Sequence, residues 1–187
     1  MSMISIAGIY PSTIADGEGF RVSVYGAGCS HECIGCHNPQ TWDIDNGTLL
    51  SVHDVFNRLN IQAKNFLDGV TFSGGDPMYQ AESFLELAKM IRTVPDKDIW
   101  CYTGYIFEDL IRNHDEKYEL LRHVDVLVDG RYVHELRDLT LGFRGSSNQR
   151  VIDVQESLQQ GTAVWYHWQG CDCNICNPIS SRIVHTY

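Results

Sequence analysis

Hydrophobic and polar positions along this chain follow two periods, one typical of strands and one typical of helices. Short apolar runs that begin or end at glycine or aspartate have the length of buried strands. These strands are expected at residues 20–26, 70–72, 98–102 and 124–128. The run at 124–128 is continuously apolar, which suits a parallel strand that is covered on both faces.

Between these runs, apolar side chains recur three and four positions apart, as on the buried face of a helix. Helices are expected at residues 51–59, 81–91, 106–114, 116–123 and 155–160. Ser51 with Asp54 three residues later is a capping pair that predicts where the first helix begins. Alternating strands and helices predict an α/β fold with a parallel sheet and right-handed connections.

The strand–helix units are too few to close an eight-stranded barrel, so we expect an open partial (β/α) barrel. In such folds the reactive residues lie at the carboxyl ends of the strands. An open side also favours a macromolecular substrate, because a loop of another protein can reach a site that a closed barrel would reserve for small molecules. We expect one main domain over residues 1–153 and a C-terminal extension over residues 154–187.

Composition narrows the function classes. The 187 residues carry a net charge of −10, which argues against nucleic acid as a partner, because its binding depends on clustered Lys and Arg. No apolar run reaches membrane-spanning length, and the N-terminus lacks the pattern of a signal peptide. We therefore expect a cytoplasmic protein without a membrane partner, in which the seven cysteines are reduced and free to bind metal.

Three of these cysteines, Cys29, Cys33 and Cys36, lie within eight residues in a CxxxCxxC pattern. The pattern offers three thiolate ligands and leaves a fourth position open. Two centres fit it: a zinc ion, for which His31 or His37 is a nearby fourth ligand, or an iron–sulfur cluster with one iron free to bind something from outside.

A second motif follows the strand at 70–72. Ser73, Gly74, Gly75 and Asp76, followed by a proline, form a turn at the carboxyl end of that strand. Glycines there let bare backbone lie against a polar ligand, although many strand–helix turns use glycine only for their geometry. The turn becomes informative through its pairing with the cysteine pattern.

Together the two motifs resemble the radical S-adenosylmethionine (SAM) enzymes, in which three such cysteines hold a 4Fe-4S cluster and a GGE or GGD turn binds the amino group of SAM. The segments DGEGFR at 16–21 and CHNPQTWD at 36–43 are similar to those of the glycyl-radical activating enzymes, with Glu18 where that family more often has proline. The stretches IWCYTGY, VLVDGRY and FRGSSNQR further resemble the activators of anaerobic ribonucleoside-triphosphate reductase. The resemblance covers residues 1 to about 153.

This resemblance implies a reaction and a set of site residues. One electron from the cluster would cleave SAM to a 5'-deoxyadenosyl radical, which would take a hydrogen from a glycine of the anaerobic ribonucleoside-triphosphate reductase. The electron would come from a donor such as a flavodoxin. The implied cofactor-binding residues are Ser73, Gly74, Gly75, Asp76, Thr103, Asp129 and Asn148, and the implied partner-binding residues are Asp16, Gly17 and Arg144. For Thr103 and Asp129, capping of a strand end is an equally good interpretation, as is loop ordering for Arg144 and Asn148.

A second group of cysteines near the C-terminus is not covered by the resemblance. Cys171, Cys173 and Cys176, with His167 close by, have the density of metal ligands. We expect either a second metal there or a tail with incidental thiols.

Two other functions stay open. The chain could be a radical SAM enzyme that acts on another glycyl-radical enzyme of the pyruvate formate-lyase type, or on a small molecule such as a deazapurine precursor. It could also be a non-catalytic metal-binding or electron-transfer module, against which the glycine turn and the open coordination position count.

Overall fold

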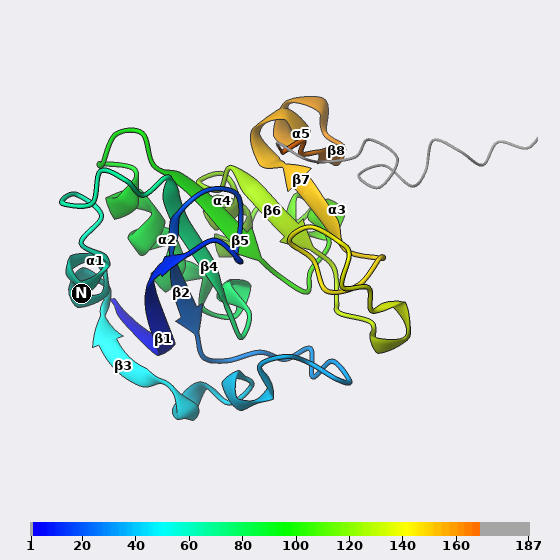
Figure 1. Cartoon of the computed structure of the whole chain (residues 1–187), viewed down its shortest axis with the longest axis horizontal. Helices are drawn as coiled ribbons and strands as arrows, with labels where there is room; N and C mark the ends of the chain where they lie inside the picture. The colour runs from blue at the N-terminus through cyan, green and yellow to red at the C-terminus, as the bar shows by residue number, and fades with distance from the viewer. Residues whose placement is uncertain (1, 169–187) are drawn as a thin grey trace, which may run out of the picture.

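The computed structural model describes residues 2–168, in which eight strands form one sheet in the order β3-β1-β2-β4-β5-β6-β7-β8 (Figure 1). The strands are β1 (Met3–Thr13), β2 (Arg21–Gly26), β3 (Thr48–Ser51), β4 (Gly69–Gly74), β5 (Asp98–Tyr102), β6 (Val126–Asp129), β7 (Arg150–Asp153) and β8 (Val164–Trp165). Among the described residues the sheet does not close, since β3 and β8 are its two edges. The predicted α/β class and open sheet are confirmed.

Four central strands carry the predicted parallel arrangement. β2, β4, β5 and β6 pair in parallel, with Tyr25 beside Ser73 and Tyr102 beside Val128. Because parallel strands point the same way, their carboxyl ends meet at one edge of the layer. The loops that leave these four ends therefore lie next to one another, as expected from the sequence.

The outer strands are antiparallel and were not predicted. β3 and β7 have only four residues each and run directly into helices, and β8 has two, so none shows a readable period. β1 is long, but its register shifts between Ile6 and Gly8 and again between Tyr10 and Thr13. Such bulges interrupt the two-residue alternation by which a strand is recognised.

The helices are α1 (Val52–Leu59), α2 (Ala81–Ile91), α3 (Phe107–Leu110), α4 (Glu116–Leu121) and α5 (Val154–Gln160), with 3-10 turns at Pro39–Thr41, Ile44–Asn46, Pro77–Gln80 and His134–Leu136. The predicted cap of α1 is confirmed: the Ser51 hydroxyl accepts a hydrogen bond from the Asp54 amide at 3.0 Å and donates one to the Asp54 carboxylate at 2.7 Å.

The helix predicted at 106–114 is wrong in its length, because α3 ends at Leu110. The chain has to reverse before α4, and His114 does so with a φ of 48° in the left-handed region. Asp115 then begins α4, since its carboxylate accepts hydrogen bonds from the amides of Lys117 and Tyr118. Apolar spacing predicted the buried residues here but not this reversal.

The two faces of the sheet differ in what covers them. On β5, Ile99 and Cys101 face the main core with the helices, whereas Trp100 and Tyr102 face the opposite side. That opposite side is aromatic and apolar over β5 to β7 and polar over β2 and β4, where Arg21 and Thr71 are fully buried. In the described part of the chain, no helix is long and apolar enough to span a membrane.

Candidate active site

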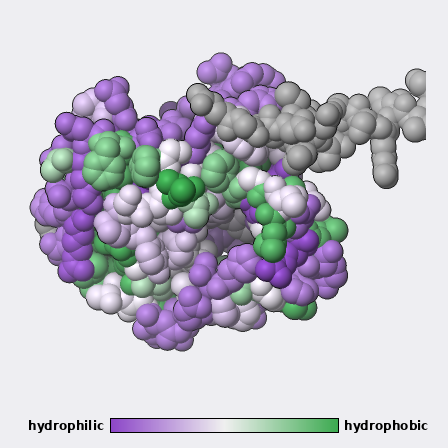
Figure 2. Space-filling model, in the orientation of Figure 1, coloured by the Kyte–Doolittle hydropathy of each residue, from purple (hydrophilic) through white to green (hydrophobic). Residues whose placement is uncertain are grey.

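A cavity of about 610 Å³ opens at the carboxyl ends of the four parallel strands. Its lining brings together parts of the chain that are far apart in sequence: the loop after β2 with all three cysteines, the turn after β4, and the residues that follow β5 and β6. Tyr25, Trp42 and Tyr102 add aromatic walls. A mostly apolar hollow of this size with a few converging polar groups is typical of a small-molecule site. In Figure 2 this side of the molecule is hollowed near its centre.

We call residues 27–38 the cluster loop, because the three cysteines lie within it. Backbone hydrogen bonds tie it to the chain that follows: the Gly28 amide donates to the Thr41 carbonyl at 2.8 Å and the Cys29 amide to the Trp42 carbonyl at 2.9 Å. All three thiols are partly exposed and face the same cavity. The loop is therefore fixed at its base while its sulfur atoms stay accessible.

The donor set of the cluster loop fits an iron–sulfur cluster. Within the described residues, no three His, Cys, Asp or Glu side chains converge on a point where one metal ion would sit. A cubane does not need such convergence, since each cysteine binds a different iron. Burial raises the pKa of the Cys29 and Cys33 thiols, so iron binding has to displace their protons.

The glycine turn after β4 packs directly on the cluster loop. A Cβ on Gly75 would lie 2.5 Å from the Gly28 carbonyl oxygen, and Gly74 has a φ of 96°. The Gly75 amide donates to the Gly26 carbonyl and the Asp76 amide to the Gly28 carbonyl. Both glycines are therefore required for the two loops to approach, and Ser73, Gly74 and Gly75 line the cavity beside the thiols.

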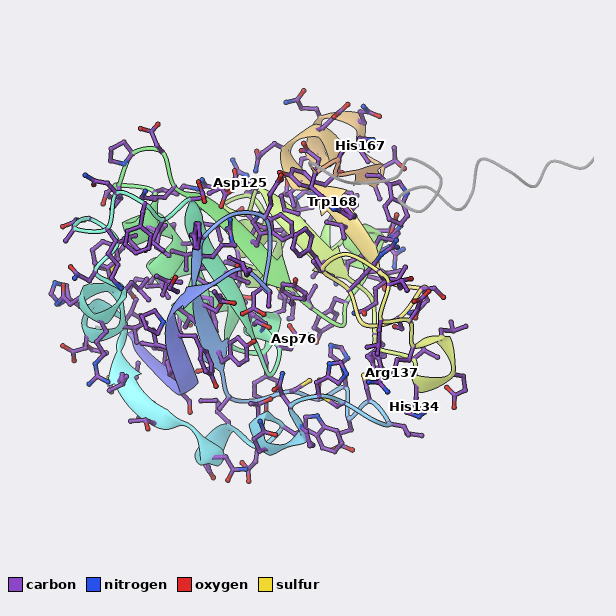
Figure 3. All side chains as sticks on the ribbon, viewed as in Figure 1. Asp76, Asp125, His134, Arg137, His167 and Trp168 are labelled. Atoms are coloured by element: carbon purple, nitrogen blue, oxygen red, sulfur yellow. The ribbon has the colours of Figure 1, made fainter. Side chains whose placement is uncertain are left out.

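Asp76 connects these loops to the end of β5. Its buried carboxylate accepts hydrogen bonds from Thr103 Oγ1 at 3.0 Å, the Gly104 amide at 3.0 Å and His31 Nε2 at 2.7 Å. It also caps the turn Pro77–Gln80 through the Met78 amide at 2.9 Å. Figure 3 shows Asp76 at the end of the sheet that faces the cluster loop. The structure thus joins Asp76 and Thr103, which the sequence had predicted separately.

Asp129, unlike Asp76, does not connect the loops around the cavity. Its carboxylate is buried outside the cavity lining, accepts a hydrogen bond from the Phe107 amide at 2.8 Å at the start of α3, and pairs with Arg150. Burial raises its pKa, although Arg150 opposes that shift. Arg150 also binds Glu108. The strand-end cap that the sequence left open is the role that these contacts describe.

The segment predicted to touch the partner begins inside the cavity and then turns away from it. The Asp16 carboxylate lines the cavity and accepts hydrogen bonds from Ser23 at 2.6 Å and Tyr25 at 3.2 Å. Gly17 is buried, and a Cβ there would lie 2.8 Å from the Trp100 ring. Only Asp16 of this pair is therefore presented to a ligand or partner.

The two predicted residues in the loop before β7, Arg144 and Asn148, also have different positions. Arg144 lines the cavity, donates to the Gln149 carbonyl at 2.9 Å and stacks over the Trp165 ring at 5.2 Å. Asn148 lies outside the lining and donates to the Arg131 carbonyl at 2.8 Å. Asn148 therefore orders the loop, whereas Arg144 is placed where a bound group can meet it.

The contacts of two residues, Arg21 and His31, were not predicted from the sequence. Arg21 is fully buried: it donates to Thr71 and to the Val70 carbonyl, pairs with Asp98, and holds the Glu18 carbonyl at 3.1 Å. His31 was weighed only as a zinc ligand, but it binds Asp76. An arginine that begins a buried strand, and a histidine between two cysteines, are signals that a single sequence does not separate from chance.

Glu18, which departs from the family pattern, has a partner of its own. Its carboxylate accepts a hydrogen bond from the Tyr166 hydroxyl at 3.0 Å. Tyr166, in the C-terminal extension, thus holds the segment before β2. Of the predicted second metal set, His167 is exposed and lies with α5 and β8, away from Asp76 (Figure 3). Cys171, Cys173 and Cys176 fall outside the described residues.

Comparisons with known proteins define the class first. The family model of a 4Fe-4S single cluster domain matches residues 15–152, which include the cluster loop, the glycine turn and all four parallel strands. The three cysteines that line the cavity lie within this match.

Curated relatives identify the family more closely. The anaerobic ribonucleoside-triphosphate reductase-activating protein of Enterobacteria phage T4 is 39% identical over 85% of this chain and 96% of that protein. The proteins of the same name from Escherichia coli K12 and Haemophilus influenzae are 38% and 36% identical, over 76% and 75% of this chain. The chain belongs to the family of anaerobic ribonucleoside-triphosphate reductase-activating proteins. A crystal structure of QueE from Escherichia coli aligns with 55% of the chain at 15% identity and a TM-score of 0.45, a likeness too small to support a conclusion.

Proposed function

We propose that this chain is an iron–sulfur radical SAM activase that generates a glycyl radical on an anaerobic ribonucleoside-triphosphate reductase. Cys29, Cys33 and Cys36 would hold a 4Fe-4S cluster, and Ser73, Gly74 and Gly75 would receive the amino group of SAM. The observation that carries the proposal is the contact between the cluster loop and the glycine turn at one end of a single cavity.

The cluster, when bound, supplies the electron that cleaves SAM into methionine and a 5'-deoxyadenosyl radical. The protein's own part is to hold, orient and shield. Backbone bonds at Gly28 and Cys29 fix the cluster loop, and Tyr25, Trp42 and Tyr102 wall the cavity against water. The radical would then take the hydrogen from the Cα of a glycine, giving 5'-deoxyadenosine and a backbone radical on the partner.

Exposed apolar side chains in the cluster loop and in the cavity lining support a protein substrate. Ile34, in the cluster loop, and Leu139, in the cavity lining, are each 79% exposed. Exposed apolar groups beside a reactive site are typical of a surface that another protein covers. Asp16 and Arg144 lie in the same lining, where an incoming backbone loop would meet a carboxylate and a guanidinium.

The test is anaerobic incubation of the reduced, iron-loaded protein with SAM and the cognate reductase, followed by electron paramagnetic resonance. We expect a glycyl-radical doublet on the reductase that requires SAM. Cleavage of SAM with no such signal would contradict the assignment of the partner and favour another glycyl-radical protein or a small-molecule substrate.

We further propose a cytoplasmic location and an electron donor such as a flavodoxin, since the family's chemistry needs a low-potential one-electron reductant.

For Cys171, Cys173 and Cys176 we keep the proposal of a second metal, with His167 as a fourth ligand. Iron and zinc analysis of the triple alanine variant tests it, because metal content equal to that of the wild type would exclude a metal there.

A further inference from the structure

We call residues 164–168, in the C-terminal extension, the strap, because they contact two separate segments that line the cavity. The first two residues of the strap form β8, which pairs with β7, and the Tyr166 amide donates to the Val151 carbonyl at 2.9 Å. Tyr166 and Trp168 then pack on the aromatic and apolar cluster opposite the helices (Figure 3). The strap is thus fixed to the sheet by its backbone and by its side chains.

The first contact of the strap is with the segment before β2. The Tyr166 hydroxyl donates to the Glu18 carboxylate at 3.0 Å, and the Tyr166 ring stands edge-on to the Trp100 ring at 5.4 Å. Burial and the neighbouring Glu18 carboxylate raise the pKa of Tyr166 to about 12, so the hydroxyl keeps the proton that it donates. Asp16, two residues before Glu18, lines the cavity. The strap therefore anchors the segment that carries Asp16.

The second contact is with the loop before β7. The Phe143 ring stands edge-on to the Trp168 ring at 5.4 Å. A Cβ on Gly142 would lie 2.7 Å from the Trp168 ring, so the backbone of the loop rests directly on that ring. Arg144 stacks over the Trp165 ring at 5.2 Å. Three consecutive residues of this loop are therefore in contact with the strap.

Phe143 needs this support, because its backbone is strained. Its φ of 58° lies in the left-handed region, which bulky residues rarely adopt. Such a conformation persists only where the surrounding structure holds it, and here the Trp100 ring at 5.1 Å and the Trp168 ring do so. The same loop presents Leu139 and Leu141 in the cavity lining. The conformation at Phe143 therefore sets how these apolar side chains are presented.

We propose that the strap holds the loop before β7 in the shape that recognises the partner, with Trp168 as the positioning residue. This inference rests on the proposed function, in which a glycine-bearing loop of the reductase meets the apolar side chains of the cavity lining. The strap should not govern SAM binding, because the loops expected to bind SAM follow β2 and β4. In the sheet order, β8 lies four strands away from β4.

The test compares two quantities in the iron-loaded Trp168→Ala variant. One is the dissociation constant for SAM from anaerobic equilibrium dialysis, and the other is the reductase concentration that gives half of the maximal glycyl-radical signal. Without Trp168 the loop has to be ordered when the partner binds, so we expect the reductase concentration to rise about tenfold. The SAM constant should stay within about twofold of the wild type, with unchanged iron content.

A matched control is Tyr118→Ala, which removes a half-buried aromatic ring of α4 that packs on His114. It should change neither quantity. For Trp168→Ala, a rise of less than about twofold in the reductase concentration would overturn the inference. An equal weakening of SAM binding would also overturn it, since the strap would then support the whole site. The proposed function would stand in both cases. If the wild-type protein forms no glycyl radical on the reductase, the proposed function fails, and the inference with it.

Gly142→Ala changes the same contact from the other side and keeps the inference testable if Trp168→Ala does not take up iron. The added methyl group would displace the Trp168 ring, so we expect a similar rise in the reductase concentration and unchanged SAM binding. The double variant should be no worse than Trp168→Ala alone, because both changes break one contact. Wild-type behaviour of Gly142→Ala, or losses that add in the double variant, would overturn the inference.

Discussion

Asp76 and Asp129 stand in similar places, yet they serve different parts of the molecule. Asp76 comes two residues after β4, and Asp129 is the last residue of β6, so both lie at the carboxyl edge of the parallel strands. Asp76 gathers donors from the cluster loop and the end of β5. Asp129 binds Arg150 and the start of α3, outside the cavity lining. A place at a strand end therefore brings a carboxylate near the site, and its neighbours decide its role.

The cysteines likewise differ in whether they belong to the cavity, and replacing one that does should have the largest effect. Cys33→Ala removes one of the three thiols in the cavity and should abolish cluster binding and SAM cleavage. Cys101→Ala is the matched control, because Cys101 is fully buried in β5 on the helix-covered face. It should retain iron and cleavage while it loses some stability. Iron content and production of 5'-deoxyadenosine are the measurements, and cleavage retained by Cys33→Ala would show that the cluster is held elsewhere.

Asp76→Asn should have the next largest effect. In asparagine, an NH2 group replaces one of the two oxygens that accept hydrogen bonds from His31, Thr103 and Gly104. Because this group donates and cannot accept, at least two charge-assisted hydrogen bonds are lost. At roughly 1.5 kcal/mol each, the loss corresponds to about a 100-fold lower rate of SAM cleavage. A rate within twofold of the wild type would mean that the Asp76 network does not support the site.

Asp129→Asn should change stability and leave cleavage nearly intact. Breaking a buried ion pair costs about 3–5 kcal/mol, and the lower end applies because Arg150 keeps Glu108 as a partner. Urea unfolding of the iron-loaded protein under anaerobic conditions would measure this loss. Wild-type stability combined with lost SAM cleavage would instead support the cofactor-binding role of Asp129 that the sequence predicted.

Glu108→Gln should have the smallest effect, and a pH-dependent one. The hydrogen bond from Arg150 lowers the pKa of Glu108 below the usual 4.5. A lowered pKa adds stability above the unfolded-state value, and this stability is lost as the pH falls through the folded-state value. The wild type should therefore exceed the variant by less than about 1 kcal/mol at neutral pH, since Glu108 is partly exposed, and this difference should shrink as the pH falls below 4.5. Unfolding midpoints across that pH range would show it, and a difference that grows in acid would contradict it.

Much of the fold could be predicted because the buried residues of the central strands are continuous in sequence. A few consecutive residues are enough to recognise the apolar pattern of the strand before Ser73, of the buried face of α2 and of the run ending at Val128. β7 and β8 could not be recognised in this way, because they are short and depend on strand pairing for their conformation: β7 pairs with β6, and β8 pairs with β7. The reversal at His114 depends on a single left-handed residue.

The parts of the site that form local motifs could be predicted from the sequence, and the contacts between distant residues could not. Cys29, Cys33, Cys36 and the glycine turn form local motifs, so the sequence predicted that they belong together. The bond between His31 and Asp76 joins residues 45 positions apart and has no local pattern. Asn148 and Gly17 belong to recognisable segments, but whether a side chain faces the cavity or the loop beneath it depends on packing that only the folded chain contains.

The most direct test of this account is the dissociation constant for SAM of two iron-loaded variants, Asp76→Asn and Asp129→Asn, measured side by side. We expect the constant to rise at least tenfold for Asp76→Asn, because the hydrogen bonds that tie the cluster loop to the end of β5 are lost, and to stay within twofold of the wild type for Asp129→Asn. Equal constants for the two variants would contradict the claim that only Asp76 supports the SAM site.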